Sequence, residues 1–183
     1  RDFSDPDIAQ NNLESPNQLI ETGEVFGYNY RIHVNKEELF FQGEFKGPKF
    51  DYYGAVELSH TQFWREGIWA NGKFPNNSSG KSEPQQFINY GIKGGGVYKI
   101  SGRHFVNANV LYQTDAPYSS NAYVSPKTRD VVVPGLESRE TYSGDISYVV
   151  RYPYLKARLT GFYSAVNNQT WARSFYHDEF RTF

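Results

Sequence analysis

The sequence contains no cysteine and no methionine. Without cysteine, the chain can form neither a disulfide framework nor a thiolate metal site. Because methionine is missing at position 1 as well, the chain is expected to begin inside a longer sequence or to have been processed. No stretch has the pattern of a signal peptide, and none has the ~18 apolar residues of a membrane helix. If this chain meets a membrane, strands must make the contact.

An excess of charge of one sign is also missing. Lys and Arg number 19 and Asp and Glu 20, which gives a net charge of −1. With no basic stripe, electrostatics offers no argument for binding nucleic acid or an anionic membrane surface. Hydrophobic residues make up only 38% of the chain, yet aromatic residues reach 17%. Tyr and Trp suit surfaces that are apolar on one side and wet on the other.

Strand-like alternation dominates from Glu24 onward. Residues 1–23 are polar, contain Pro6 and Pro16 and have no clean period, so they are predicted to be an irregular lead-in. Period-two alternation then predicts about seven strands, which makes residues 24–183 a single β domain. The expected strands cover approximately residues 26–34, 39–46, 50–59, 88–100, 105–112, 141–152 and 155–164.

Three consecutive glycines, Gly94 to Gly96, lie inside one of these expected strands. A phosphate-binding loop needs a defined glycine spacing followed by a helix, and the alternation from Ile88 to Ile100 provides neither. A second segment, Gly67 to Lys73, has the glycine and lysine spacing of a nucleotide-binding loop. Phe74 and Pro75 follow it where Ser or Thr and a helix are required. Neither segment is predicted to bind nucleotide.

Strand length and connection length favour a transmembrane barrel. Most expected strands run ~9–12 residues, which matches a tilted membrane-spanning strand. Connections at 47–49, 101–103 and near 153 are tight, whereas those near 63–86, 114–140 and from 167 are long. Outer-membrane barrels have short turns at one rim and long loops at the other. The short connection expected at 35–38 lies at the long-loop rim and does not fit this pattern.

The fold prediction is therefore an all-β, antiparallel up-and-down meander that forms part of a larger transmembrane β-barrel. Its lipid face is predicted from the apolar positions of the alternation. A soluble β-sandwich that binds a ligand is the alternative, because charges on the polar face are satisfied equally by solvent or by a wet lumen. The residues predicted to face lipid are Tyr28, Tyr30, Val56, Ile92, Ile146 and Leu159, and the polar face carries Lys93, Lys99, Asp145, Arg151, Lys156 and Arg158.

Several segments resemble the barrel of TonB-dependent outer-membrane receptors of the Bacteroidetes type. They are TQFWREG (61–67), NGKFP (71–75), NYGIKGGGVYKISGRHF (89–105), residues 112–136 and 140–164, and SFYHDEFRTF (174–183). The resemblance implies energised uptake of a nutrient (a glycan, a siderophore or a peptide) across the outer membrane of a Gram-negative cell. It implies outer-membrane lipid, the TonB complex and a surface lipoprotein as partners. With no plug domain, no TonB box and too few strands for a ~22-stranded barrel, the chain is expected to be a barrel fragment.

Aromatic and hydrogen-bonding side chains of the long loops are the candidate ligand contacts, because rings stack on ligands and charged groups fix their orientation. The same rings are equally suited to an interfacial girdle. The chain is not predicted to be an enzyme or to hold a metal or cofactor. Its histidines, at 33, 60, 104 and 177, lack zinc spacing, and Ser59 and His60 point to opposite faces of a strand. Tyr176 to Glu179 is expected to be a solvated loop. The candidate ligand residues are Trp64, Arg65, Trp69, Asn71, Tyr118, Tyr123, Trp171 and Arg173.

Overall fold

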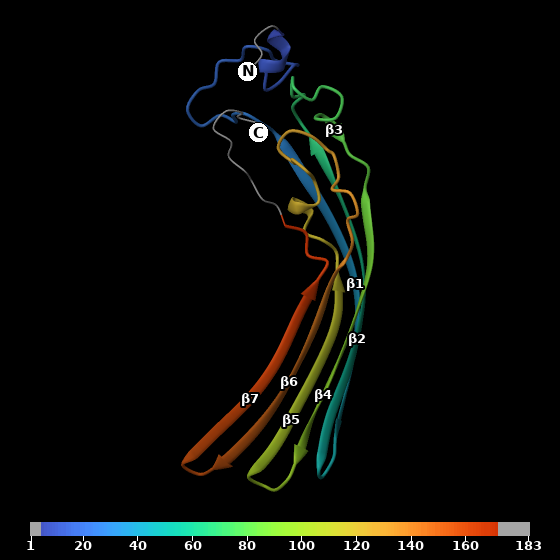
Figure 1. The fold of residues 1–183 in the computed structure, drawn as a ribbon, viewed down its shortest axis with the longest axis vertical. Helices are drawn as coiled ribbons and strands as arrows, with labels where there is room; N and C mark the ends of the chain where they lie inside the picture. Colours follow the sequence, from blue (N-terminus) through green and yellow to red (C-terminus); the bar gives the residue numbers. More distant parts are fainter. Residues whose placement is uncertain (1–4, 172–183) are drawn as a thin grey trace.

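The computed structural model describes residues 5–171 as one curved antiparallel sheet with loops gathered at one end (Figure 1). Neighbouring strands follow the order β1-β2-β4-β5-β6-β7, and the short β3 pairs with β2. Two 3-10 turns, η1 (Pro6–Ala9) and η2 (Ser119–Asn121), lie outside the sheet. The sheet is not closed, and β1 and β7 form its two edges. The strands are β1 (Tyr30–Lys46), β2 (Phe50–Gly67), β3 (Gly80–Lys81), β4 (Gln85–Lys99), β5 (His104–Asp115), β6 (Arg139–Tyr152) and β7 (Leu155–Asn167).

The predicted all-β antiparallel meander is confirmed, but the expected break at 35–38 is wrong. β1 runs unbroken through this segment, and Asn35 and Glu38 pair with Gln62 and Ser59 of β2. The apolar alternation changes phase here: it occupies even positions before residue 35 and odd positions from Leu39. We attribute this change to the surroundings of β1, described below. The seventh strand of the sheet is instead the two-residue β3.

The two faces of the sheet differ sharply in chemistry. Residues directly opposite each other in an antiparallel pair point to the same side, so the pairing assigns every strand residue to a face. We call the face that carries Val56, Ile92, Ile146 and Leu159 the outer face; all four are exposed. The opposite face is the inner face. Its charged members from Lys36 downward are Lys36, Glu38, Glu44, Lys46, Asp51, Glu57, Lys93, Lys99, Asp115, Arg139, Asp145, Arg151, Lys156 and Arg158.

Two rows of rings border an aliphatic band on the outer face. Toward the loops, Tyr112 contacts Tyr142 and Tyr90, with ring centroids 4.9 and 5.7 Å apart. Toward the tight turns, a second row comprises Phe45, Phe50, Tyr52, Tyr98, His104, Tyr148 and Tyr152. Between the rows the outer face carries mostly aliphatic side chains and glycines, together with the rings of Phe41 and Tyr163. No Asp, Glu, Lys or Arg occurs there on the outer face of the six long strands.

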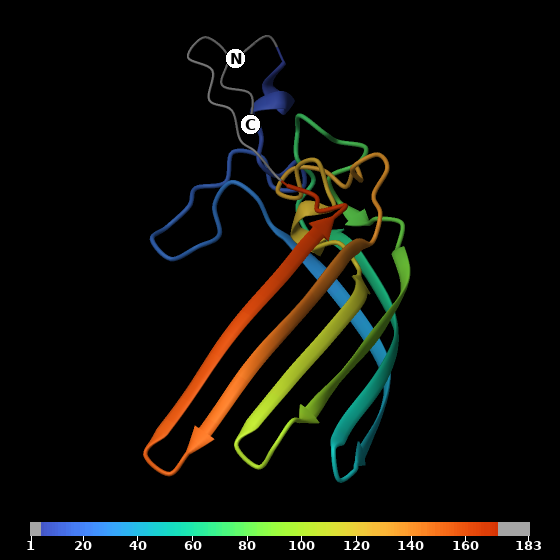
Figure 2. The same cartoon turned by 60° about the horizontal axis from the view of Figure 1, so that its bottom comes forward.

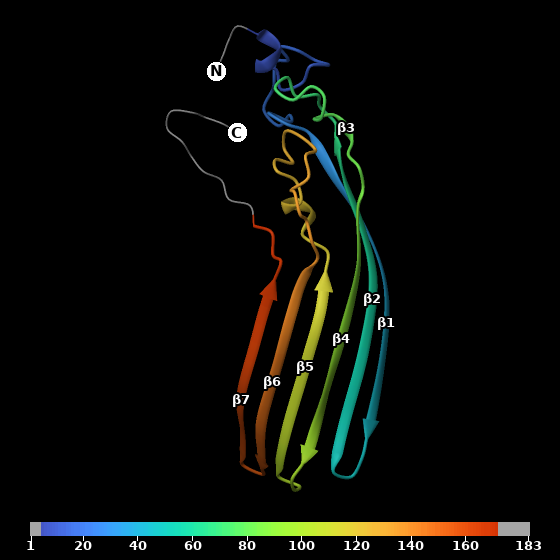
Figure 3. The same ribbon diagram turned by 45° about the vertical axis from the view of Figure 1, so that its right-hand side comes forward.

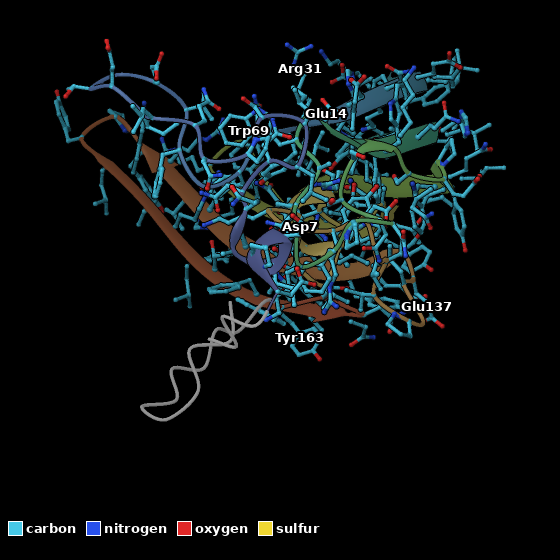
Figure 4. All side chains as sticks on the ribbon, turned by 90° about the horizontal axis from the view of Figure 1, so that it is seen from above. Asp7, Glu14, Arg31, Trp69, Glu137 and Tyr163 are labelled. Carbon is cyan, nitrogen blue, oxygen red and sulfur yellow. The ribbon has the colours of Figure 1, made fainter. Side chains whose placement is uncertain are left out.

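Two residues predicted to face lipid do not. Tyr28 lies before β1 begins, and Nζ of Lys127, from the connection between β5 and β6, lies over its ring at 5.0 Å. Tyr30 pairs with Gly67, which places it on the inner face, and the guanidinium of Arg65 lies over its ring at 5.4 Å. The upper part of β1 turns its apolar residues inward because the loops cover the inner face there. Its lower part, from Leu39 to Phe45, turns them outward. Figure 4, viewed from the loop end, shows Arg31 and Tyr163 of the outer face projecting away from the loops.

The strands are displaced along one another in a regular way. Asp51, the last paired residue of the first hairpin on β2, lies opposite Val97 of β4, whereas the last paired residue of β4 in the second hairpin is Lys99, two residues further on. The row through Lys99 reaches β6 at Val149, three residues before the last pair of the third hairpin at Tyr152. The three hairpins nevertheless end at a similar level (Figure 1). At about 3.3 Å per residue and about 4.8 Å between strands, this displacement corresponds to a strand tilt of roughly 35–45°.

The consecutive glycines of β4 have no side chains, so aromatic rings from β2 can lie directly over the β4 backbone. On the inner face, a Cβ on Gly95 would lie 2.7 Å from Cε1 of Tyr53. The Tyr53 ring thereby crosses β4, and its hydroxyl donates to Oδ1 of Asn109 on β5 at 3.1 Å. On the outer face, a Cβ on Gly96 would lie 2.8 Å from Cζ of Phe50. Side chains that reach over a bare backbone thus join strands that are not neighbours.

The long connection between β5 and β6, residues 116–138, folds over the inner face near the loop end (Figure 3). Its Ala122 and Tyr123 form a small core with Phe63 of β2, and Phe87, Val132 and Leu136 pack against this core. The connection between β2 and β4 covers the rim beside it (Figure 2). Within residues 5–171, no helix has the length and apolar character needed to cross a membrane.

Candidate functional site at the loop end

Two of the predicted loop residues, Trp64 and Arg65, belong to a strand. β2 extends to Gly67, so the loop expected from residue 63 begins only at Ile68. Neighbouring residues on a strand point to opposite sides, and these two diverge. Trp64 lies on the outer face, where its ring stacks on His33 at 5.0 Å, and Arg65 lies on the inner face beneath the loops. They cannot contact one ligand together.

Arg65 is buried, and its side chain joins three segments by hydrogen bonds. Only 1% of the residue is exposed. Its Nη1 donates to the carbonyl of Ser78 in the β2–β4 connection at 2.7 Å, and its Nε donates to the carbonyl of Pro126 in the loop 116–138 at 2.7 Å. Desolvation lowers the pKa of this guanidinium from its usual value. Arg65 therefore connects β2 to the two loops at the loop end and is not accessible to a ligand.

Tyr123 is likewise part of the scaffold. The residue is 3% exposed, and its ring packs edge-on against Phe63 with centroids 6.4 Å apart. Its hydroxyl lies 3.1 Å from Oγ of Ser82, a side chain that also accepts a hydrogen bond from the Arg65 backbone N–H at 3.0 Å. Arg65 and Tyr123 thus act in one hydrogen-bonded unit that fixes the loop 116–138.

Trp69 and Asn71 lie in the first long loop, beneath the lead-in. The Trp69 N–H donates to the carbonyl of Asn29 at 3.3 Å, and the Asn71 N–H donates to Oγ of Ser78 at 2.8 Å. The lead-in joins this loop through the Leu13 N–H, which donates to the carbonyl of Ala70 at 2.7 Å. In Figure 4, Trp69 lies near the part of the lead-in that carries Asp7 and Glu14.

Tyr118 is the predicted residue best placed to meet a ligand. It is 56% exposed, and Nη1 of Arg139 donates to its hydroxyl at 3.0 Å. Nη2 of Arg139 donates to Oδ2 of Asp115 at 2.8 Å, and Oδ1 of Asp115 accepts from Nε2 of Gln113 at 2.8 Å. The hydrogen bonds to Asp115 and Tyr118 raise the pKa of Arg139. The ring is therefore held in a fixed position while its surface stays open.

The remaining predicted residues lie at the end of the chain. Trp171 is 73% exposed. Arg173 falls outside the described residues, as do His177 and the carboxylates of Asp178 and Glu179.

A hollow on the inner face continues from the Tyr118 cluster and was not predicted from the sequence. Gly91 leaves a gap there, bordered by Glu57 and Gln113. The hollow has a volume of about 200 Å³, and Phe40 and Lys93 also line it. These residues alternate on neighbouring strands, so alternation predicts their shared face but not their convergence around one glycine.

The side chains that the sequence suggested for catalysis or metal binding do not converge among the described residues. Ser59 is buried on the inner face and His60 lies on the outer face, so they diverge as expected. Within residues 5–171, no three metal-ligating side chains of His, Cys, Asp or Glu lie close enough to share an ion. The loop end and the hollow offer rings, an amide, carboxylates and cations to a ligand.

Comparison with protein-family models, curated proteins and solved structures found no match to this chain.

Proposed function

We propose that this chain is part of the wall and outer mouth of a TonB-dependent outer-membrane transporter of the Bacteroidetes type. The observation that carries the proposal is the division of the sheet between an outer face with an uncharged, ring-bordered band and a charged inner face. Transmembrane barrels present this division, with an apolar band flanked by aromatic girdles toward lipid and a polar lumen. The strand tilt of roughly 35–45° supports the proposal, since membrane barrels tilt by a similar angle.

In this role the inner face lines the path of a nutrient: a glycan, a siderophore or a peptide. Tyr118 offers an exposed ring at the mouth, and the hollow around Gly91 offers Glu57, Lys93 and Gln113 further along the wall. Energy for uptake is delivered by the TonB complex through parts of the transporter other than this sheet. The chain contributes passage and recognition, and no covalent step is assigned to it.

The alternative, a soluble β-sandwich, requires a second sheet over the apolar outer face. Within residues 5–171, the loops cover only part of the inner face, and nothing packs against Ile92, Val110 or Leu159 from outside. A buried sandwich face also has no reason to concentrate its rings in two border rows. The two-row pattern therefore favours lipid over a second sheet.

Single-cysteine labelling tests the proposal, because the natural chain has no cysteine. We expect Ile146→Cys, introduced into the parent protein in membranes, to react with a lipid-soluble maleimide and to resist a charged one. Asp145→Cys, its neighbour on the inner face, is the matched control and should react with the charged reagent through the lumen. Equal reaction of both positions with the charged reagent would show that water bathes both faces, and the barrel proposal would fail.

A further inference from the structure

Charge is unevenly distributed along the strands. We define the short-turn end as residues 46–51, 99–105 and 149–158, which are the three tight hairpins with the last paired residues before them. This end carries seven cations and a single carboxylate, Asp51, whereas the whole chain has a net charge of −1. The rest of the chain is correspondingly acidic. The cations are Lys46, Lys49, Lys99, Arg103, Arg151, Lys156 and Arg158.

Most of these cations face inward. Lys46 and Asp51 are directly opposite each other in the register of β1 and β2, and both lie on the inner face with Lys99. Arg151, Lys156 and Arg158 lie on the same face. Only Lys49 and Arg103 sit in the turns themselves. A surface built to hold lipid headgroups would place its cations on the outer face. The direction of these side chains therefore excludes a lipid surface as their principal partner and indicates an occupant of the concave side.

Three of the inward cations lack a carboxylate partner. Lys99 lies 2.7 Å from Asp51, and Lys46 lies 3.5 Å from Glu44. In contrast, no Asp or Glu within residues 5–171 forms an ion pair with Arg151, Lys156 or Arg158, although the guanidinium of Arg151 lies over the Phe105 ring at 4.9 Å. Arg151 and Lys156 are moreover directly opposite each other. Like charges in that position repel, so this part of the sheet is stabilised by an added anion.

The carboxylate on the same face of β6 is already occupied and distant. Asp145 accepts two hydrogen bonds from Nδ2 of Asn109, each at 3.1 Å. It lies six residues before Arg151, which is about 20 Å along an extended strand. The sheet therefore cannot neutralise the three cations with its own inner-face groups.

We propose that the inner face at the short-turn end docks an acidic polypeptide segment, with Arg151, Lys156 and Arg158 as its main contacts. The unpaired cations lie on the neighbouring strands β6 and β7, and Lys99 and Lys46, which already have carboxylate partners, continue the cationic surface to β4 and β1. The distance from β1 to β7 covers five strand spacings, about 24 Å. A single phosphate or carboxylate would contact a small part of this width, whereas an extended segment carrying several Asp or Glu residues matches it. Guanidinium groups bind carboxylates with two parallel hydrogen bonds, which adds geometry to charge.

The proposal goes beyond passage of a nutrient and does not depend on it. An acidic segment can dock on a concave sheet whether or not the outer face meets lipid. A binding assay on the full 183-residue chain in detergent therefore tests it separately from the labelling experiment.

The probe is a short fluorescent peptide of alternating Glu and Ser, and the readout is fluorescence anisotropy at low salt. We expect the triple variant R151Q/K156Q/R158Q to bind it about tenfold more weakly than the wild type, because each exposed ion pair contributes modestly. The matched control, K73Q/K81Q/K127Q, removes three exposed cations at the loop end and should bind as the wild type does. Added salt should weaken binding to the wild type.

Three results would overturn the proposal. A Gln/Ser peptide that binds equally well would show that charge plays no part. A control variant that loses as much affinity as the triple variant would show that only net charge matters. Tripolyphosphate that displaces the peptide at far lower concentration than the free unlabelled peptide would identify a small-anion site instead. If the triple variant fails to fold by circular dichroism, the salt dependence and the Gln/Ser comparison on the wild type still decide.

Discussion

Removal of the Arg65 guanidinium and its hydrogen bonds should open the loop 116–138 without unfolding the sheet. In Arg65→Gln, the carbonyls of Ser78 and Pro126 lose their donors, and each buried unsatisfied carbonyl costs about 1–3 kcal/mol. The cation–π contact with Tyr30 adds about 1 kcal/mol. Removing a desolvated charge offsets part of this loss, since burial already lowers the pKa of the guanidinium. A net cost of about 3 kcal/mol corresponds to roughly a hundredfold higher population of the open loop.

Limited proteolysis with trypsin measures this opening directly, because Lys127 and Arg129 lie inside the loop. When opening is fast, the cleavage rate follows the open population, so Arg65→Gln should be cut there about a hundredfold faster. Cleavage after Lys49, in the first tight turn, serves as the internal reference. Arg65→Lys should behave almost like the Gln variant, because a point charge cannot reach two carbonyls from different loops.

The matched control is Arg31→Gln, which removes an exposed arginine from the outer face of β1 and should leave the cleavage rate unchanged. The reasoning would be refuted if Arg65→Gln were cleaved at the wild-type rate, or if Arg65→Lys kept the loop fully protected. The first result would mean that the Phe63–Tyr123 core alone holds the loop. The second would mean that charge, not the fork of donors, is what matters.

Gly95→Ala should lower the free energy of unfolding by about 1–3 kcal/mol in urea titrations, because its methyl group meets Oδ1 of Asn109, the Tyr53 ring that is hydrogen-bonded to it and the carbonyl of Ala108. Gly54→Ala, which meets nothing within 4 Å, is the control, and equal losses in both variants would dismiss the role of these contacts. The hydrogen bond from His33 to Glu66, at 2.7 Å, holds the pKa of Glu66 below its usual value. The contribution of this carboxylate to the stability of the fold is therefore present at neutral pH and is lost as pH falls through the lowered pKa. Carboxylate NMR should show a titration of Glu66 that moves up to the ordinary value in His33→Gln, and an unmoved titration would contradict the assignment.

Alternation predicted most of the sheet because each strand has one apolar and one polar face throughout. It misread β1 because the two halves of that strand face different surroundings. Above residue 35 the apolar side chains, such as Tyr30, meet the loop core on the inner side, and from Leu39 they turn to the outer side. A change of phase and a turn look identical in sequence, and only the unbroken pairing with β2 separates them.

The candidate site was less accessible to prediction than the strands. Aromatic and charged loop residues were grouped by composition, but Arg65 and Tyr123 are buried whereas Tyr118 remains open. What separates them is contact between segments far apart in the chain, such as Arg65 with Pro126. The hollow around Gly91 depends in the same way on the register of neighbouring strands. Neither contact leaves a local signal in the sequence.

The wall that these strands build differs in height from one side to the other. β2 continues nine residues beyond Leu58, the last aliphatic outer-face residue of that strand, whereas β6 begins only three residues before Tyr142. At about 3.3 Å per residue, the first side rises roughly 20 Å further along the strand than the second. The upper ends of the strands therefore slope, from high at β1 and β2 to low at β6 and β7 (Figure 1). Above β5 and β6 the rim is continued by the connection 116–138 instead of by strands, so a loop completes the wall on this side.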